Sequence, residues 1–122
     1  MADKPDAIKP YIHDLLAPVC KNRAANTYDA GPNGKLPDEF LVYFLVSKQP
    51  RGFFSGKPCR SNRRYQASYY TRDRAKLDPA LTAIEQAMTA GGFLHAGAGP
   101  ELEHQETGHW SVSCDFRWIE EE

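Results

Sequence analysis

The sequence predicts a single α+β domain in which a mainly antiparallel β-sheet is flanked by two helices. Two segments have apolar residues at the spacing of a helix, and others alternate or run apolar like strands. Their order is helix, strand, strand, helix, strand, strand, with links short enough for antiparallel pairing. The 122 residues match the usual size of one domain, so the whole of 1–122 is assigned to it.

The first helix is expected from about Asp6 to Cys20. Pro10 is tolerated in its first turn, where the missing N–H has no partner, and Pro18 is expected to kink or stop the helix near its other end. One apolar stripe runs along this segment, formed by Ile8, Ile12, Leu15, Leu16 and Val19.

The second helix has clear start and stop signals. Asp78 is expected to be its N-cap and Pro79 its first helical residue, while Gly91 and Gly92 end it. The buried stripe of this helix is expected to consist of Leu81, Ile84 and Met88.

Strands are expected on either side of the second helix. Residues 40–46 are apolar on both faces, so this central strand should be covered on both sides. Residues 64–72 form the next strand, residues 93–102 a weak one, and residues 109–119 alternate most clearly. The Gly- and Asn-rich stretch 22–37 is expected to be a long loop that becomes ordered only against a partner.

A projecting arm is expected at about residues 48–63, between the first two strands. Pro50, Gly52 and Pro58 interrupt the strand pattern there and give the segment a loop-like character. Phe53 and Phe54 are adjacent in this arm and are poorly placed to enter their own core together. An exposed aromatic pair usually marks a contact site.

The cysteines and the apolar segments indicate the cellular compartment in which the chain is expected. Three cysteines without a CxxC spacing predict reduced thiols, with Cys20 and Cys114 buried and Cys59, among basic residues, the most reactive. The longest apolar run, residues 40–46, is too short to cross a bilayer. The N-terminus lacks the apolar core of a signal peptide, which predicts a cytoplasmic location at least at first.

No catalytic constellation is recognisable. His95, His104 and His109 lie among acidic residues, but no HxxxH or HExxH spacing is present, and alternation would place His95 and His104 on opposite sides of a hairpin. A solvated hairpin with polar side chains explains the same residues and is favoured over a metal site. The chain also has no GxSxG, P-loop or GxGxxG motif. We therefore expect no enzyme activity, no cofactor and no metal.

Charge is unevenly distributed along the chain. Between Lys48 and Lys76 there are nine basic residues and one acidic residue, and between Glu101 and Glu122 there are seven acidic residues and one arginine. Opposite blocks of this kind can pair within the fold, bind other partners, or bind the opposite block of a neighbouring copy. The expected interface residues are Arg51, Phe53, Phe54, Lys57, Arg60, Arg63, Arg64, Glu101, Glu103 and Glu106.

Two functions agree with the basic, aromatic segment. Copies of the chain could pair head to tail through the two charged blocks and close into a ring. Alternatively, a small nucleic-acid-binding protein could use residues 48–76, with arginines on phosphates and rings stacked on bases. The acidic block offers a ready complement within the same chain, so protein contact is favoured.

Four stretches, which with the first helix span nearly the whole chain, stand in a telling order and spacing. They are residues 36–43, 64–71, 84–88 followed by Gly92-Phe93, and 109–116. In this order and spacing the chain resembles the small tail-completion or tail-terminator proteins, also called minor tail proteins, of long-tailed bacteriophages and related prophages. The arm and the acidic tail belong to no signature of that family, so their roles are inferred from charge alone.

The resemblance implies a structural virion protein rather than an enzyme. Such proteins form a ring, typically a hexamer, that completes the tail tube and joins it to the head. The implied partners are other copies of the chain, the tail tube protein and a head-side connector protein, with DNA only as cargo in the channel and no membrane. The implied location is the virion, and the host cytoplasm during assembly. Phosphate contacts would slow passing DNA, so the basic arm is expected to face a protein neighbour.

Overall fold

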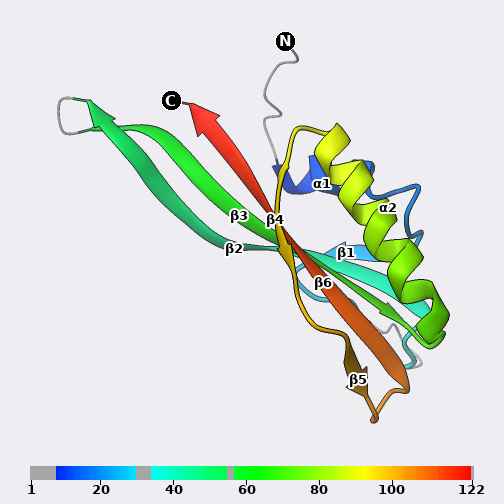
Figure 1. Cartoon of the computed structure of the whole chain (residues 1–122). Helices are drawn as coiled ribbons and strands as arrows, with labels where there is room; N and C mark the ends of the chain where they lie inside the picture. Colours follow the sequence, from blue (N-terminus) through cyan, green and yellow to red (C-terminus); the bar gives the residue numbers. More distant parts are fainter. Residues whose placement is uncertain (1–7, 30–33, 55–56, 122) are drawn as a thin grey trace.

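The computed structural model describes residues 8–29, 34–54 and 57–121, with side chains described outside residues 49–61 and 120–121. Two helices and six strands make up the described chain, and a short 3₁₀ helix precedes the second helix (Figure 1). In chain order the elements are α1 Ile8–Leu15, β1 Arg23–Ala25, β2 Glu39–Phe54, β3 Lys57–Thr71, η1 Arg74–Lys76, α2 Leu77–Ala90, β4 Leu94–Ala98, β5 Leu102–His104 and β6 His109–Glu121.

The strands form one mixed sheet in the order β1-β2-β3-β6-β4, with β5 paired to β6 beyond the end of β4. Only β1 runs parallel to its neighbour, and the other pairings are antiparallel. The predicted class, an α+β fold with a sheet flanked by two helices, is confirmed. Both helices lie on the same face of the sheet (Figure 1). Neither described helix is long and apolar enough to span a bilayer.

The core lies between this face and the helices. Every second residue of the central strands points into it, as a period of two requires. Leu41 pairs with Tyr69 and Tyr69 with Val112, so three buried side chains line up across the sheet. The helices contribute the fully buried residues Ile12, Ile84 and Met88 to the same cluster, which accounts for the apolar stripes in their sequences.

The first helix is shorter than expected. It ends at Leu15 rather than near Cys20, and its expected start at Asp6 lies outside the described residues. The next residues form turns, because Pro18 disfavours a helical conformation at the residue before it. Leu16 and Cys20 nevertheless remain buried beside the helix, so the stripe continues into the turns.

The start of the second helix also differs from the prediction. Asp78 is not the N-cap: α2 begins at Leu77, directly after η1, and it is Asp73 that caps η1 by accepting a hydrogen bond from the Ala75 N–H. Pro79 is still tolerated, because the first turn of a helix has unpaired N–H groups. The predicted stop is confirmed, since Gly91 is the C-cap and Gly92 has a φ of 99°.

The segment between the first two strands is a β-ladder rather than a loop. Strands β2 and β3 pair from Glu39–Thr71 to Phe54–Lys57, with a bulge between Leu45 and Ser47. The expectation of a projecting arm is confirmed, because this hairpin extends well beyond the helical layer (Figure 1). Its expected loop-like character is wrong, because these residues pair in a ladder. The prolines and glycines of the arm do not prevent this pairing, since edge strands tolerate them.

The loop expected at residues 22–37 contains a strand that the sequence did not predict. Residues 23–25 form β1, which pairs with Leu41, Val42 and Tyr43 of β2. The following residues pass over the sheet face opposite the helices, where Tyr28 packs on Phe40 with ring centroids 4.9 Å apart. Phe40 and Val42 are buried there, so the first part of β2 is covered on both faces as predicted. The prediction is wrong for the end of the 40–46 segment, because Leu45 and Val46 are exposed.

Candidate interface surfaces

The outer edge of the arm is open in the described chain. Strand β1 pairs with β2 only as far as Tyr43, and the pairings of the rest of β2, to Phe54, are all with β3 on its other side. Strand β6 accompanies β3 as far as the Arg60–Glu121 pair, so it closes the opposite side of the arm. An edge of this kind presents unpaired N–H and C=O groups to any strand that approaches it.

Exposed apolar side chains lie where the arm leaves the body of the fold. Leu45 and Val46, at the bulge of β2, are 40% and 49% exposed, and Ile119 of β6 is 38% exposed. The bulge shifts the register of β2 at this point and breaks the alternation of buried and exposed side chains. Two consecutive residues, Leu45 and Val46, are therefore both exposed. The base of the arm therefore offers both a backbone edge and apolar surface.

The opposite charge blocks meet within the same chain. Arg64 Nη2 lies 2.7 Å from Asp115 Oδ2, across neighbouring strands β3 and β6. Arg74 Nη2 lies 3.6 Å from Glu101 Oε1 and its guanidinium lies over the Trp110 ring. These contacts correspond to the first of the three arrangements that the charge pattern allowed, which is pairing inside one fold.

The predicted interface residues thus fall into three groups. Arg64 and Glu101 are engaged within the chain, which the sequence could not show. Arg63 is half-buried on β3, whereas Glu103 and Glu106 are exposed near the β5–β6 turn. The backbones of the other five lie in the arm, but their side chains are outside the described set: Arg51, Phe53, Phe54, Lys57 and Arg60.

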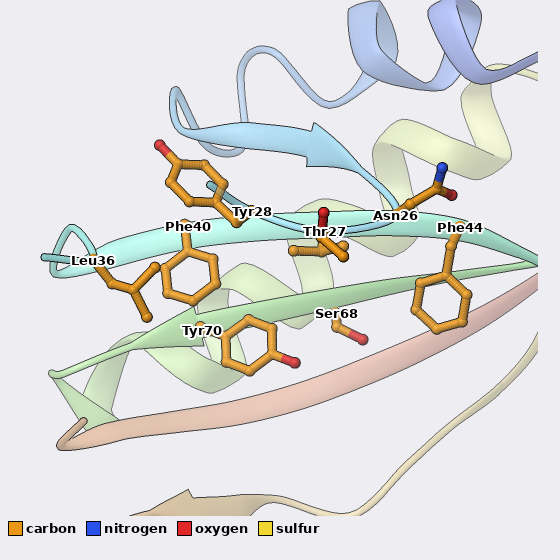
Figure 2. Close-up of a pocket in the computed structure, with 9 residues that line it drawn as sticks. Asn26, Thr27, Tyr28, Leu36, Phe40, Phe44, Ser68 and Tyr70 are labelled. Carbon is orange, nitrogen blue, oxygen red and sulfur yellow. The ribbon is translucent and has the colours of Figure 1, made fainter. Parts of the chain in front are cut away.

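An aromatic groove of about 330 Å³ lies on the sheet face away from the helices (Figure 2). Phe40 forms its centre: its ring stacks on Tyr70 of β3 at 4.6 Å and lies beside Tyr28. Ser68 and Phe44 continue the groove toward the arm. The sequence indicated that β2 is apolar on both faces, but it gave no sign that Tyr70 and the residues after β1 would join it.

The three histidines near the acidic residues do not converge. His104 Nε2 lies 2.8 Å from Ser111 Oγ on the groove side of the sheet, and the buried His109 has its Nε2 2.8 Å from the carbonyl oxygen of Pro37. His95 lies on the helix side instead, so the expectation that His95 and His104 occupy opposite sides is confirmed. A metal site built from these three histidines is excluded by their placement.

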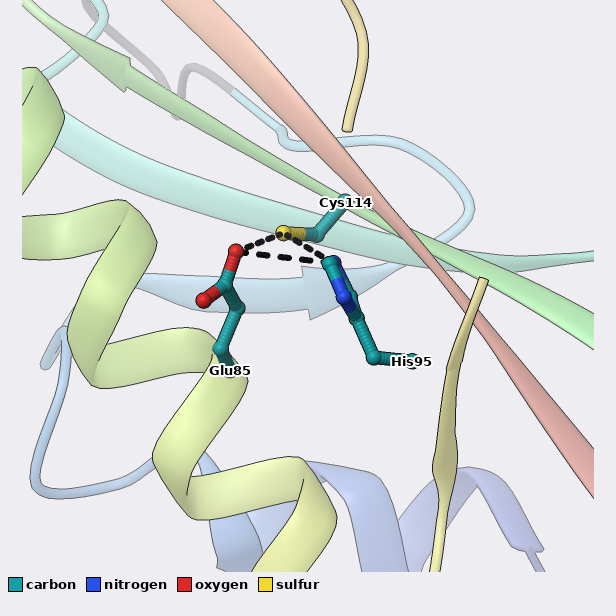
Figure 3. Close-up of side chains that lie close together, drawn as sticks. All are labelled: Glu85, His95 and Cys114. Carbon is teal, nitrogen blue, oxygen red and sulfur yellow. Dashed lines mark hydrogen bonds and ion pairs between the residues drawn. The ribbon is translucent and has the colours of Figure 1, made fainter. Parts of the chain in front are cut away.

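His95 instead meets two residues that the sequence did not connect with it. Its Nε2 lies 3.4 Å from Glu85 Oε1 of α2 and 3.9 Å from Cys114 Sγ of β6 (Figure 3). Cys114 is fully buried, and this burial, with Glu85 and Asp115 nearby, raises the pKa of its thiol to about 12. No sequence spacing could have revealed the cluster, because each residue comes from a different element.

The predicted burial of two cysteines is confirmed. Cys20 and Cys114 are 2% and 0% exposed. Burial, with Glu39 nearby, raises the pKa of the Cys20 thiol to about 11. The predicted reactivity of Cys59 stays a prediction, since its side chain is outside the described set.

Comparison with known proteins assigns the chain to no group: no protein-family model matches it, and no curated protein matches it significantly.

Proposed function

We propose that this chain is a structural subunit of a bacteriophage tail that assembles with copies of itself into a ring. By the resemblance of its sequence, the ring is a hexamer that completes the tail tube and joins it to the head. The observation that carries the proposal is the arm, whose base exposes Leu45 and Val46 and whose outer β2 edge, from Phe44 to Phe54, pairs with no other strand among the described residues.

An open edge of this length is available to a neighbouring strand. Proteins normally shorten, charge or cover their edge strands, because a free edge recruits other strands without control. A neighbouring copy that adds a strand or packs on the edge provides such a cover. When the covering surface differs from the covered one, the contact is head to tail, and a suitable rotation closes it into a ring.

Fewer charged residues are available for a contact between copies than the sequence suggested. Arg64 and Glu101 already have partners within the chain, so they contribute less to a contact between copies. Glu103 and Glu106 remain exposed and available to a basic neighbour. The contact is therefore built from backbone pairing and apolar packing along the arm, with the remaining charges setting its orientation.

The nucleic-acid alternative is less well supported. Tyr65 is 3% exposed, so its ring cannot stack on a base. Arg72 is 2.6 Å from Asp38, and Arg64 and Arg74 also have acidic partners. A salt titration with duplex DNA separates the two functions, because phosphate binding weakens steeply as salt increases.

The test of ring assembly is native mass measurement with negative-stain imaging of the purified protein, alone and with tail tubes as template. We expect six-fold rings. The variant Val46→Lys places a charge at the open edge and should abolish them, whereas Thr82→Lys, at an exposed position of α2, should not. Rings that form equally well with Val46→Lys would refute the proposed contact.

A further inference from the structure

Three potential ligand atoms converge at one point between α2 and the sheet. Cys114 Sγ lies 4.0 Å from Glu85 Oε1 and 3.9 Å from His95 Nε2, while Glu85 Oε1 and His95 Nε2 are 3.4 Å apart. The three side chains come from β6, α2 and β4, and all point to the same small volume (Figure 3). Among the described residues this is the one group of metal-ligating atoms found so close together.

The geometry does not fit a cysteine–histidine–carboxylate catalytic triad. In such a triad the nucleophile meets one ring nitrogen of the histidine and the carboxylate meets the other, so that the histidine relays between them. Here the sulfur and the carboxylate oxygen both approach Nε2. Atoms arranged in this way surround a common centre rather than form a chain.

The spacing fits a tetrahedral ion. Zinc binds sulfur at about 2.3 Å and nitrogen or oxygen at about 2.0–2.1 Å, which places the ligand atoms about 3.3–3.6 Å apart in a tetrahedron. The observed separations of 3.4, 3.9 and 4.0 Å need only a small inward movement of the sulfur or of its two partners.

We propose that Glu85, His95 and Cys114 bind a divalent transition-metal ion of the zinc class through Oε1, Nε2 and Sγ. A thiolate with an imidazole selects soft or borderline ions and disfavours magnesium and calcium. The side chains of Glu85 and His95 are 36% and 37% exposed, so the fourth position opens to solvent and takes a water molecule. Three protein ligands with one open position are typical of reactive rather than purely structural zinc sites.

The surrounding fold holds the three residues in place. Cys114 lies on the central strand β6, opposite Ala67 of β3, in the middle of the core. A bulge between His95 and Gly97 shifts the register of β4, and Gly97 adopts a φ of 127° there. Bulges of this kind re-aim side chains and are common beside functional sites. Glu85 follows the fully buried Ile84, which fixes its position on α2.

The test uses tag-free, chelator-treated full-length protein titrated with Co²⁺ alone. We expect one ion per chain and the near-ultraviolet charge-transfer absorption of a cobalt–thiolate bond, which Zn²⁺ then removes by displacing the cobalt. Cys114→Ala should abolish this absorption, whereas Cys20→Ala and Cys59→Ala should retain it.

The affinity for the ion tests the other two ligands. Losing an outer-shell partner alone typically weakens metal binding about 10–100-fold. Accordingly, His95→Ala and Glu85→Gln should weaken it more than about hundredfold, and the matched controls His104→Ala and Glu103→Gln should not.

Two results would overturn the metal site: cobalt–thiolate absorption that survives Cys114→Ala, or wild-type affinity no higher than that of His95→Ala. Because the His95 side chain is partly exposed, His95→Ala keeps the test valid even if Cys114→Ala fails to fold. The outcome does not depend on ring assembly, since all three ligands belong to one chain.

Discussion

Arg64 of β3 and Asp115 of β6 form an ion pair between neighbouring strands, with Nη2 and Oδ2 2.7 Å apart. The two side chains are 46% and 27% exposed, so water screens the attraction. Exposed pairs contribute about 0.2–1 kcal/mol to stability. We expect Arg64→Gln and Asp115→Asn each to lower the free energy of unfolding by less than about 1 kcal/mol, measured by urea denaturation of the monomer.

The double-mutant cycle of Arg64→Gln and Asp115→Asn isolates the pair itself. A coupling energy well above about 1 kcal/mol would contradict the screened-pair interpretation. The same variants address the interface, because a residue already paired within its chain contributes little to a neighbour. Ring formation should therefore survive Arg64→Gln.

Replacing both Phe53 and Phe54 by alanine should weaken ring assembly while leaving the fold intact. The two residues pair with Pro58 and Lys57 near the tip of the arm, far from the helical layer (Figure 1). The measurements are native mass for assembly and thermal unfolding for the fold. Phe116→Ala serves as the control for an aromatic side chain that lies in the core, and it should destabilise the fold by about 3–5 kcal/mol. A double mutant that simply unfolds would show that the pair is core.

The sequence predicted secondary structure and burial best where a segment follows a single hydrophobic period. Residues 109–119 alternate apolar and polar side chains, and β6 buries Val112, Cys114 and Phe116 as that alternation requires. β1 escaped prediction because Arg23–Ala25 has no apolar period, and its place depends on backbone pairing with β2. The ladder of the arm was missed for a related reason: Pro50, Gly52 and Pro58 are read as loop residues unless the partner strand is known.

The candidate sites were less predictable than the fold. Pairing of Arg64 with Asp115 depends on the register of β3 against β6, which charge counts cannot supply. The convergence of Glu85, His95 and Cys114 depends on that register, on a bulge in β4 and on the packing of α2. Such relationships arise from tertiary structure alone, so local spacing carries no trace of them.

Alkaline pH should destabilise the fold through Cys20. Burial raises the pKa of its thiol from 9.0 to about 11, with Glu39 acting in the same direction and Arg23 opposing it. The unfolded chain therefore loses this proton first, so the contribution to stability is full below pH 9.0 and is lost as the pH rises toward about 11. Tyr69 lies nearby and its pKa is raised as well, so it adds to the loss at higher pH.

The variant Cys20→Ala separates the thiol from the other groups. Urea midpoints measured below pH 9.0 and near pH 11 should fall less between the two conditions in this variant than in the wild type. Equal falls would mean that Cys20 does not carry the effect. At neutral pH, a thiol reagent should leave native Cys20 unmodified, because only the thiolate reacts at a useful rate.

The bulge of β4 should depend on the absence of a side chain at residue 97. Gly97 has a φ of 127°, which residues with a Cβ rarely adopt, yet an added Cβ would meet no atom within 4 Å. The cost of Gly97→Ala is therefore backbone strain alone, about 1–3 kcal/mol. Gly99 is the matched control, because its φ is ordinary and an added Cβ would make van der Waals contact with Ser113.

Thermal and urea unfolding should accordingly rank Gly99→Ala close to the wild type and Gly97→Ala clearly below it. Because His95 precedes the bulge, relief of the strain by a register change would also move its ring relative to Cys114. Amide exchange of the β4–β6 ladder would detect that change as faster exchange confined to this edge of the sheet. If Gly97→Ala is as stable as Gly99→Ala, the bulge does not require glycine, and the placement of His95 has another cause.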